Sequence, residues 1–294
     1  MSTVFSSSVS ETVRDAFNFT VDKFPLSGPD GMRTPWYALF RSDTNQPVGN
    51  GSVSSRYEPH TTDDVLALCD AASVAFNGIA DVTCDFRDGH YVVINPTEQE
   101  RVNIFGGVDN VWPRVVIRAP YDGKSFKASI ATYRDLCRNL HIMRSTGNTT
   151  TISIRHNSGL RKHMNELIDQ FNRLKGGWSN LLDTVREMER RRFAMVDFLR
   201  AVYGEPKESA NSITQHKNRT EAIFKRLQRE LDLRGETFGE NFTVSGWLAF
   251  NAVQGYVQHE ARRNGRNKTS NSAGLILSLT DPFVHKAEEL VLAA

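Results

Sequence analysis

The sequence predicts an α+β fold, with an antiparallel sheet of hairpins and packed helices followed by a mostly helical C-terminal half. Three observations lead to this prediction. Residues 34–132 contain β-rich runs separated by turn signals, which is typical of consecutive hairpins. From about residue 130 onward, apolar residues recur mainly at helical spacing. A hydrophobic fraction of 39% in 294 residues is sufficient for a folded core.

Strand signals dominate the first part of the chain. Trp36–Arg41 and Ser52–Tyr57 are strand candidates joined by a loop, and Thr61 or Thr62 is expected to cap a helix that ends near Asn77-Gly78. Two hairpins follow, built from the runs VTCDF, HYVVINP, VWPRVVIRAP and SFKASIATYR. Pro113 inside the third run indicates an edge strand or a bulge.

Helical periodicity dominates the second part. The expected elements are a short helix, one β-branched strand and four longer helices, at Asp135–Met143, Thr149–Ile154, Ser158–Leu174, Trp178–Val202, Ile213–Leu233 and Phe242–Arg263. Gly176-Gly177 is expected to end the third of these elements and Gly204-Glu205-Pro206 the fourth.

These patterns divide the chain into four predicted regions. They are an N-terminal arm at 1–30, an α+β core at 31–203, a C-terminal helical region at 204–270 and a tail at 271–294. The core contains a basic helix–strand–helix stretch between Tyr133 and Lys175.

Charge is distributed unevenly along the chain. Residues 1–130 hold 11 Lys+Arg against 16 Asp+Glu, whereas residues 131–234 hold 20 against 12. The net charge of +2 therefore hides a basic middle, which suits contact with a polyanion such as nucleic acid. The alternative is a helical region whose arginines and lysines are solvated or pair with nearby carboxylates, among them Asp135, Glu166 and Asp169.

Several classes of protein are disfavoured. Three widely spaced cysteines and the absence of a signal-peptide pattern favour a reducing cytoplasm, and no apolar run is long enough for a membrane span. Cys137 and His141 could share one helix face, but no established metal motif supports a site, so no metal or cofactor is expected. Phosphate-loop and nucleophile motifs are missing, which favours a protein that is not an enzyme.

Four ordered stretches resemble a phage- and plasmid-encoded domain-of-unknown-function family, number nine-three-two. They are PDGMRTPWYALFRSDTNQPVGNGSVSSRYEPH at 29–60, RDLCRNL at 134–140, SIRHNSGL at 153–160 and SGWLAFNAVQGYVQH at 245–259. The likeness covers about residues 20–260, and the sequence departs from the family pattern at Leu140-His141. The core is also remotely similar to single-strand annealing proteins of the Rad-fifty-two-like superfamily, a likeness at the level of fold.

This resemblance implies a homo-oligomeric ring or filament that binds and anneals single-stranded DNA in phage or plasmid recombination, in a bacterial cytoplasm and without nucleotide hydrolysis. Cations would follow the phosphates, and planar side chains would support the bases. The predicted nucleic-acid-binding residues are Tyr133, Arg134, Arg138, Arg144, Arg155, His156, Arg161 and Lys162. The alternative functions are a protein-interaction or structural role in a mobile element, and a cryptic hydrolase.

Overall fold

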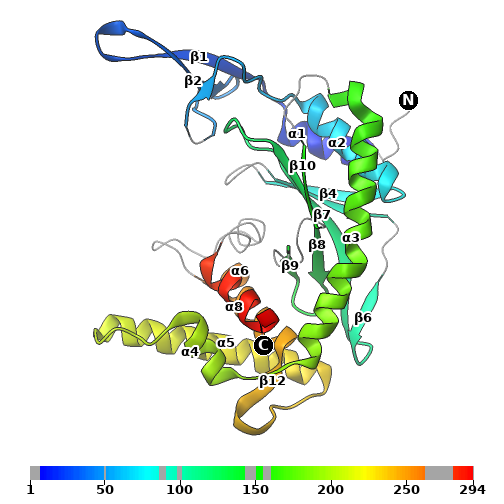
Figure 1. Ribbon diagram of the computed structural model, residues 1–294, viewed down its shortest axis with the longest axis vertical. Helices are drawn as coiled ribbons and strands as arrows, with labels where there is room; N and C mark the ends of the chain where they lie inside the picture. The colour runs from blue at the N-terminus through cyan, green and yellow to red at the C-terminus, as the bar shows by residue number, and fades with distance from the viewer. Residues whose placement is uncertain are drawn as a thin grey trace. The chain divides into compact units, whose positions relative to one another are not determined.

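The chain forms two compact units in the computed structural model, which describes residues 7–49, 51–85, 91–97, 101–142, 150–154, 160–261 and 281–293. The first unit comprises Met1–Gln99, Pro113–Ile130 and Asn148–Gly177, and the second comprises Glu100–Trp112, Ala131–Gly147 and Trp178–Ala294. Each unit is therefore assembled from separate stretches of chain, and the four regions predicted from the sequence stay a prediction. Strands predominate early and helices late, which confirms the α+β class (Figure 1).

The main sheet has the strand order β10-β8-β7-β5-β4, with β6 beside β7 and β9 beside β8. The β4–β5, β5–β7 and β8–β10 pairs are antiparallel, and the first of them is a hairpin that the sequence predicted. The strands of this sheet are β4 (Ile79–Asp85), β5 (Tyr91–Pro96), β6 (Val102–Phe105), β7 (Asp109–Arg118), β8 (Phe126–Arg134), β9 (Asn139–His141) and β10 (Thr151–Ile154).

Pro113 lies within β7, which is an interior strand rather than an edge. Its missing amide is tolerated because β7 changes partner around this position. Residues 109–111 of β7 pair with β6, and residues 115–118 pair with β5. Pro113 falls between these two segments, where no ladder bond to either strand is required of it.

In the first unit, helix α2 (Thr62–Ala75) is buried on nearly all sides. Thr61 is its cap: the Asp64 amide donates to Thr61 Oγ1 at 3.3 Å, and the Thr61 amide donates to Asp64 Oδ2 at 2.9 Å. This capping box confirms the predicted helix start. Helix α1 (Ser7–Ala16) packs against α2 and β4.

A second, three-stranded sheet completes the first unit. Strands β1 (Val21–Ser27), β2 (Arg33–Arg41) and β3 (Val53–Ser54) follow the order β1-β2-β3. Its core contains Leu39, Val48, Val53, Tyr57 and Tyr121. Toward the turn at Pro29–Gly31 the β1–β2 hairpin leaves this core, and its large apolar side chains become exposed.

The second unit is mostly helical. Its elements include the end of α3 (Met164–Arg190), β11 (Arg192–Ala194), α4 (Met195–Tyr203), α5 (Ala210–Arg234), β12 (Thr243–Ser245), α6 (Gly246–His259) and α8 (Pro282–Ala293). Helix α6 lies at its centre and packs against α5, α8 and β9. Ser245 caps α6, because the Leu248 amide donates to Ser245 Oγ at 3.2 Å.

Three helix predictions were wrong in detail. Asp135–Met143 is not a helix: residues 135–138 form a turn, and Asn139–His141 is strand β9. Helix α3 continues through Gly176-Gly177, since the burial of Leu174 and Trp178 outweighs a cost of about 1 kcal/mol per glycine. The predicted helix from Trp178 to Val202 is interrupted at β11, which pairs with β12.

Candidate nucleic-acid interface

The RDLCRNL stretch forms the hairpin that joins β8 to β9. Residues 135–138 make its turn, and Arg138 adopts a left-handed conformation, with φ of 57°. A row of amides on α6 holds β9 in place: Gln254 Nε2 and Gln258 Nε2 both donate to Leu140 O, at 2.9 and 2.7 Å. The turn is thereby attached to a buried helix, which fixes where the side chains on either side of it lie.

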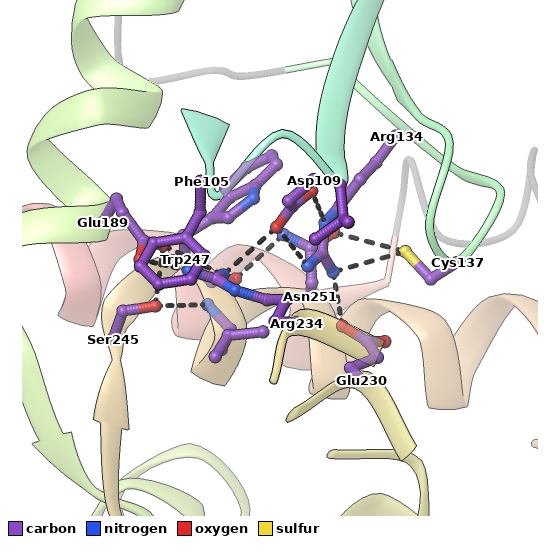
Figure 2. Close-up of polar contacts among 12 residues, drawn as sticks. Phe105, Asp109, Arg134, Cys137, Glu189, Glu230, Arg234, Ser245, Trp247 and Asn251 are labelled. Carbon is purple, nitrogen blue, oxygen red and sulfur yellow. Dashed lines mark hydrogen bonds and ion pairs between the residues drawn. The ribbon is translucent and has the colours of Figure 1, made fainter. Parts of the chain in front are cut away.

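Arg134 points inward from this hairpin into a buried ion cluster, which we define as Asp109, Arg134, Glu189, Glu230 and Arg234 (Figure 2). Arg134 binds Asp109 through two bonds, Nε to Oδ1 at 2.7 Å and Nη2 to Oδ2 at 2.5 Å, and it also contacts Glu230. Arg234 donates to Asp109 Oδ2 at 3.1 Å and to Glu189 Oε1 at 2.5 Å. The cluster thus ties β7, β8, α3 and α5 together.

Burial and charge compete at Arg134. Desolvation opposes the charged guanidinium, but Glu230 and Asp109 outweigh it, so the pKa of Arg134 is raised. Arg134 is 1% exposed, and carboxylates occupy its donors. The prediction that Arg134 contacts nucleic acid is therefore corrected, because this guanidinium has a structural role and is closed to an external phosphate.

Tyr133 and Arg138, on either side of Arg134, do come together. Both line a pocket of about 460 Å³, walled by the β8–β9 turn, α5 and the end of α6. From α5 the pocket receives Arg226, Arg229 and Glu230, and from α6 it receives His259. We call this the Arg138 pocket. Two predicted residues thus meet four charged or titratable residues, Arg226, Arg229, Glu230 and His259, that the sequence prediction did not include.

The pocket continues into a larger hollow of about 1090 Å³ along the same helix. Arg226, Arg229 and His259 line both spaces, so we describe them together as the α5 groove. The larger part adds two cations and three aromatic side chains, which are Arg219, Lys225, Tyr203, Tyr256 and Phe283. Cations and aromatic rings along one groove are the two features that single-strand binding requires.

Arg226 is held in place on the wall of this groove. Its Nε donates to Glu260 Oε1 at 3.2 Å, and its Nη1 lies 3.9 Å from Glu230 Oε1. The guanidinium also lies close to α6 at Gly255, where an added Cβ would be 2.6 Å from Arg226 Nη1. Gly255 therefore provides the space that lets Arg226 reach this position.

Arg138 and Arg229 differ from Arg226 in having exposed side chains. Within the part of the chain that the structure describes, no carboxylate lies within ion-pair distance of either one. Unpaired arginines beside a pocket favour an anionic ligand, because a guanidinium offers a planar fork of donors to phosphate.

Arg219 has a different neighbourhood at the far end of the groove. Its guanidinium stacks over the Tyr203 ring at 3.9 Å and lies 5.8 Å from the Phe283 ring centre. Burial is the main reason that the pKa of Tyr203 is raised, so its hydroxyl stays neutral. This end of the groove thus presents flat, partly apolar surfaces beside a cation.

His259 lies between the two parts of the groove. Burial, followed by the nearby charges of Arg226 and Arg138, lowers the pKa of His259 from 6.5 to about 4. Its Nε2 is 3.1 Å from Asn139 Oδ1, and Asn139 Nδ2 already donates to Asn251 O and Oδ1. Asn139 Oδ1 therefore accepts, His259 Nε2 carries the proton, and an added proton must go to Nδ1.

This lowered pKa makes stability depend on pH. Between pH 6.5 and 4 the unfolded chain protonates His259 while the folded chain does not, so stability falls as the pH falls through this range. Because the ring is partly exposed, we expect a contribution of about 1–2 kcal/mol rather than the full value. His259→Gln should remove that part of the slope in urea unfolding measured from pH 7 to 4. An unchanged slope would contradict the prediction.

The other predicted residues are distributed as follows. Arg144, Arg155 and His156 lie outside the described residues, so their role stays a prediction. Arg161 and Lys162 belong to a short 3-10 helix, Leu160–His163, in the first unit, and the Lys162 side chain is exposed.

The sequence contained a signal for the α5 arginines that the predicted list of site residues left out. Arg219, Arg226 and Arg229 have spacings of seven and three residues, which place them on one face of a helix. The basic character of this segment was evident, but only the folded hairpin shows that its arginines face Arg138. The site therefore depends on a tertiary contact between the hairpin and α5, which no local sequence pattern indicates.

A comparison with protein families agrees with the motifs quoted above. The family model described as Domain of unknown function (DUF932) matches residues 50–276, which is more than half of the chain. The chain belongs to the DUF932 family. No curated protein and no solved structure matches it. The DUF932 match spans β8, β9, α5 and α6, so the whole α5 groove except its α8 wall lies within the family region.

Two other features of the described residues bear on the site. Among them, no three His, Cys, Asp or Glu side chains gather closely enough to hold a metal ion. Cys137 lies in the β8–β9 turn and His141 on β9, so the shared helix face considered for them does not exist. None of the helices in the described ranges has the length and apolar character needed to cross a membrane.

Proposed function

We propose that this DUF932 protein binds single-stranded DNA in the α5 groove and promotes strand annealing as a homo-oligomer, without nucleotide hydrolysis. The observation that carries the proposal is the groove itself, in which Arg138, Arg226, Arg229, Lys225 and Arg219 share a wall with aromatic side chains. We place the activity in phage or plasmid recombination in a bacterial cytoplasm, on the strength of the family resemblance described above.

Single-stranded nucleic acid suits this groove for a physical reason. Unpaired bases expose flat faces that stack on aromatic rings, while the backbone follows the cations. The groove supplies Tyr133 at one end and Tyr256 and Phe283 at the other, and cations lie between them. Contacts of this kind position a strand without reading its sequence, as an annealing protein requires.

The proposal is tested by fluorescence polarisation with a labelled oligodeoxythymidylate over a range of salt concentrations. We expect binding that weakens as salt rises, because counterions are released when phosphates are neutralised. Arg138→Ala with Arg229→Ala should weaken binding roughly 100-fold at low salt, since two charge-assisted contacts are lost. The matched control is Arg190→Ala on α3, an exposed arginine that lines neither part of the groove. Lack of binding at low salt would end the proposal.

One observation favours a second candidate function, that of a protein-interaction module. The β1–β2 hairpin exposes Phe24, Leu26, Met32 and Trp36, at 52%, 39%, 70% and 49%. Phe24 packs edge-on against Phe40, at 5.4 Å between ring centres, so part of this surface is a structured apolar face. Trp36→Lys should lower the molar mass measured by light scattering if the hairpin joins copies of the chain. An unchanged mass for this variant would remove the hairpin from any such assembly.

A further inference from the structure

The Arg138 pocket combines a concentrated positive charge with a planar side chain. Three guanidiniums, of Arg138, Arg226 and Arg229, line it from two separate elements, and within the described ranges Glu230 is the one carboxylate that lines it. Tyr133 lines the same space. A pocket of about 460 Å³ is within the size range of small-ligand sites, which is roughly 300–1,000 Å³. The pocket is less than half the size of the adjoining part of the groove, which measures about 1090 Å³.

We infer that the Arg138 pocket binds a phosphomonoester carried on a nucleoside, with the arginines on the phosphate and Tyr133 beside the base. The ligand is either a free nucleotide or the terminal phosphate of a DNA strand. Binding of a terminal phosphate rests on the proposed function and would place the end of a DNA strand in the pocket. Binding of a free nucleotide does not depend on the proposed function.

Charge matching favours a terminal phosphate over an internal one. An internal phosphodiester carries one negative charge, whereas a phosphomonoester carries about −1.5 to −2 near neutral pH. The pocket lining has an excess of two positive charges when His259 is neutral. Glu260 offsets part of this excess, because it binds Arg226 at 3.2 Å. Arg138 and Arg229, which pair with no carboxylate among the described residues, leave two guanidiniums for the two charges of a phosphomonoester, whereas an internal phosphodiester would neutralise only one of them.

The pKa of His259 responds to the charge in the pocket. Among the described residues, the titratable and charged groups that line the two spaces beside His259 are Tyr133, Cys137 and Arg138 from the hairpin, Arg226, Arg229 and Glu230 from α5, and Tyr203, Arg219, Lys225, Tyr256, Glu260 and Asp281 in the larger part. Without a ligand, burial and then the charges of Arg226 and Arg138 lower the pKa of His259 to about 4. A bound dianion offsets the charges of these arginines, so we expect the pKa of His259 to rise when the phosphate binds.

The first experiment follows the His259 imidazole by NMR while deoxythymidine 5′-monophosphate is added, with deoxythymidine as the control. We expect the nucleotide, but not the nucleoside, to move the resonance and to raise the pKa of His259. Affinity should fall as the pH is lowered through about 6, because the phosphomonoester loses its second charge there. A His259 resonance that does not respond to the nucleotide would overturn the inference.

Variants show whether the arginines hold the phosphate. Arg138→Ala and Arg229→Ala should each weaken nucleotide binding roughly tenfold. Gly255→Ala keeps every charge but displaces Arg226, so a similar loss would show that the position of this guanidinium matters. Arg190→Ala should have no effect. If both single arginine variants bind the nucleotide as the natural protein does, the inference fails.

Oligonucleotides of one sequence, ending in a 5′-phosphate, a 3′-phosphate or hydroxyls, distinguish the two sources. Roughly tenfold tighter binding of a phosphorylated strand assigns the pocket to strand ends. Equal binding of all three, together with the nucleotide response of His259, assigns it to free nucleotides. A nucleotide response without binding of any oligonucleotide would refute the proposed function and leave the phosphomonoester site standing.

Discussion

Arg134→Ala is expected to lower the free energy of unfolding by about 3–5 kcal/mol, the range found when one member of a buried ion pair is removed. The substitution leaves Asp109 with no exposed surface and Glu230 at 3% exposure, both without their main partner. Arg234 still binds Asp109, so the remaining carboxylate most in need of a cation is Glu230. Urea unfolding followed by tryptophan fluorescence measures the loss, since Trp247 lies 5.6 Å from the Arg134 guanidinium.

The matched control for Arg134→Ala is Arg200→Ala. Arg200 pairs with Asp197 at 3.0 Å and with Glu205 at 2.6 Å, but its side chain is half exposed. Water replaces such a pair at little cost, so we expect a change of about 0–1 kcal/mol. If the two variants lose equal stability, the cluster does not hold the second unit together, and Arg134 would need another explanation.

Arg134 also shows what a sequence can and cannot reveal about a site. Tyr133, Arg134 and Arg138 look alike as members of one basic stretch. Their environments differ because alternation along β8 directs Arg134 inward, while Arg138 lies in the turn. The partners that neutralise Arg134, Asp109 and Glu230, are 25 and 96 residues away in the chain. No local pattern indicates such pairs, so burial of a charged residue could not be predicted.

The fold was predictable where local chemistry determines it. The Thr61 cap and the β-branched run before Arg155 gave the start of α2 and strand β10 correctly. The errors occurred where tertiary packing outweighs propensity. Helix α3 passes through Gly176-Gly177 because buried residues lie on both sides of the glycines. Strand β9 replaces a predicted helix because amides of α6 satisfy its backbone at Leu140.

The same distinction applies to the groove. A basic helical face on residues 219–229 is visible in the sequence, and so is a basic stretch near Arg138. What joins them is α6, whose amide row holds β9 on one side while Gly255 receives Arg226 on the other. The groove is thus a consequence of how a buried helix holds two basic segments next to each other.

Arg138→Gly should reduce single-strand affinity roughly tenfold while leaving stability unchanged or raising it by up to about 1 kcal/mol. Arg138 has φ of 57°, a conformation that glycine adopts without the steric cost that a Cβ imposes. The same change removes an unpaired guanidinium from the pocket. Polarisation measures the affinity, and thermal and urea unfolding measure the stability.

Two companion variants separate charge from backbone at this position. Arg138→Ala should lose the same affinity without the gain in stability, because alanine keeps the Cβ. Arg138→Lys should retain most of the salt dependence, whereas Arg138→Gly should reduce its slope by about 0.7, the value for one phosphate contact on a single strand. Opposite changes in binding and stability cannot result from damage to the fold. If instead Arg138→Gly binds single-stranded DNA as tightly as the natural protein does, then Arg138 contacts no phosphate of the strand, and its proposed role in the groove is wrong.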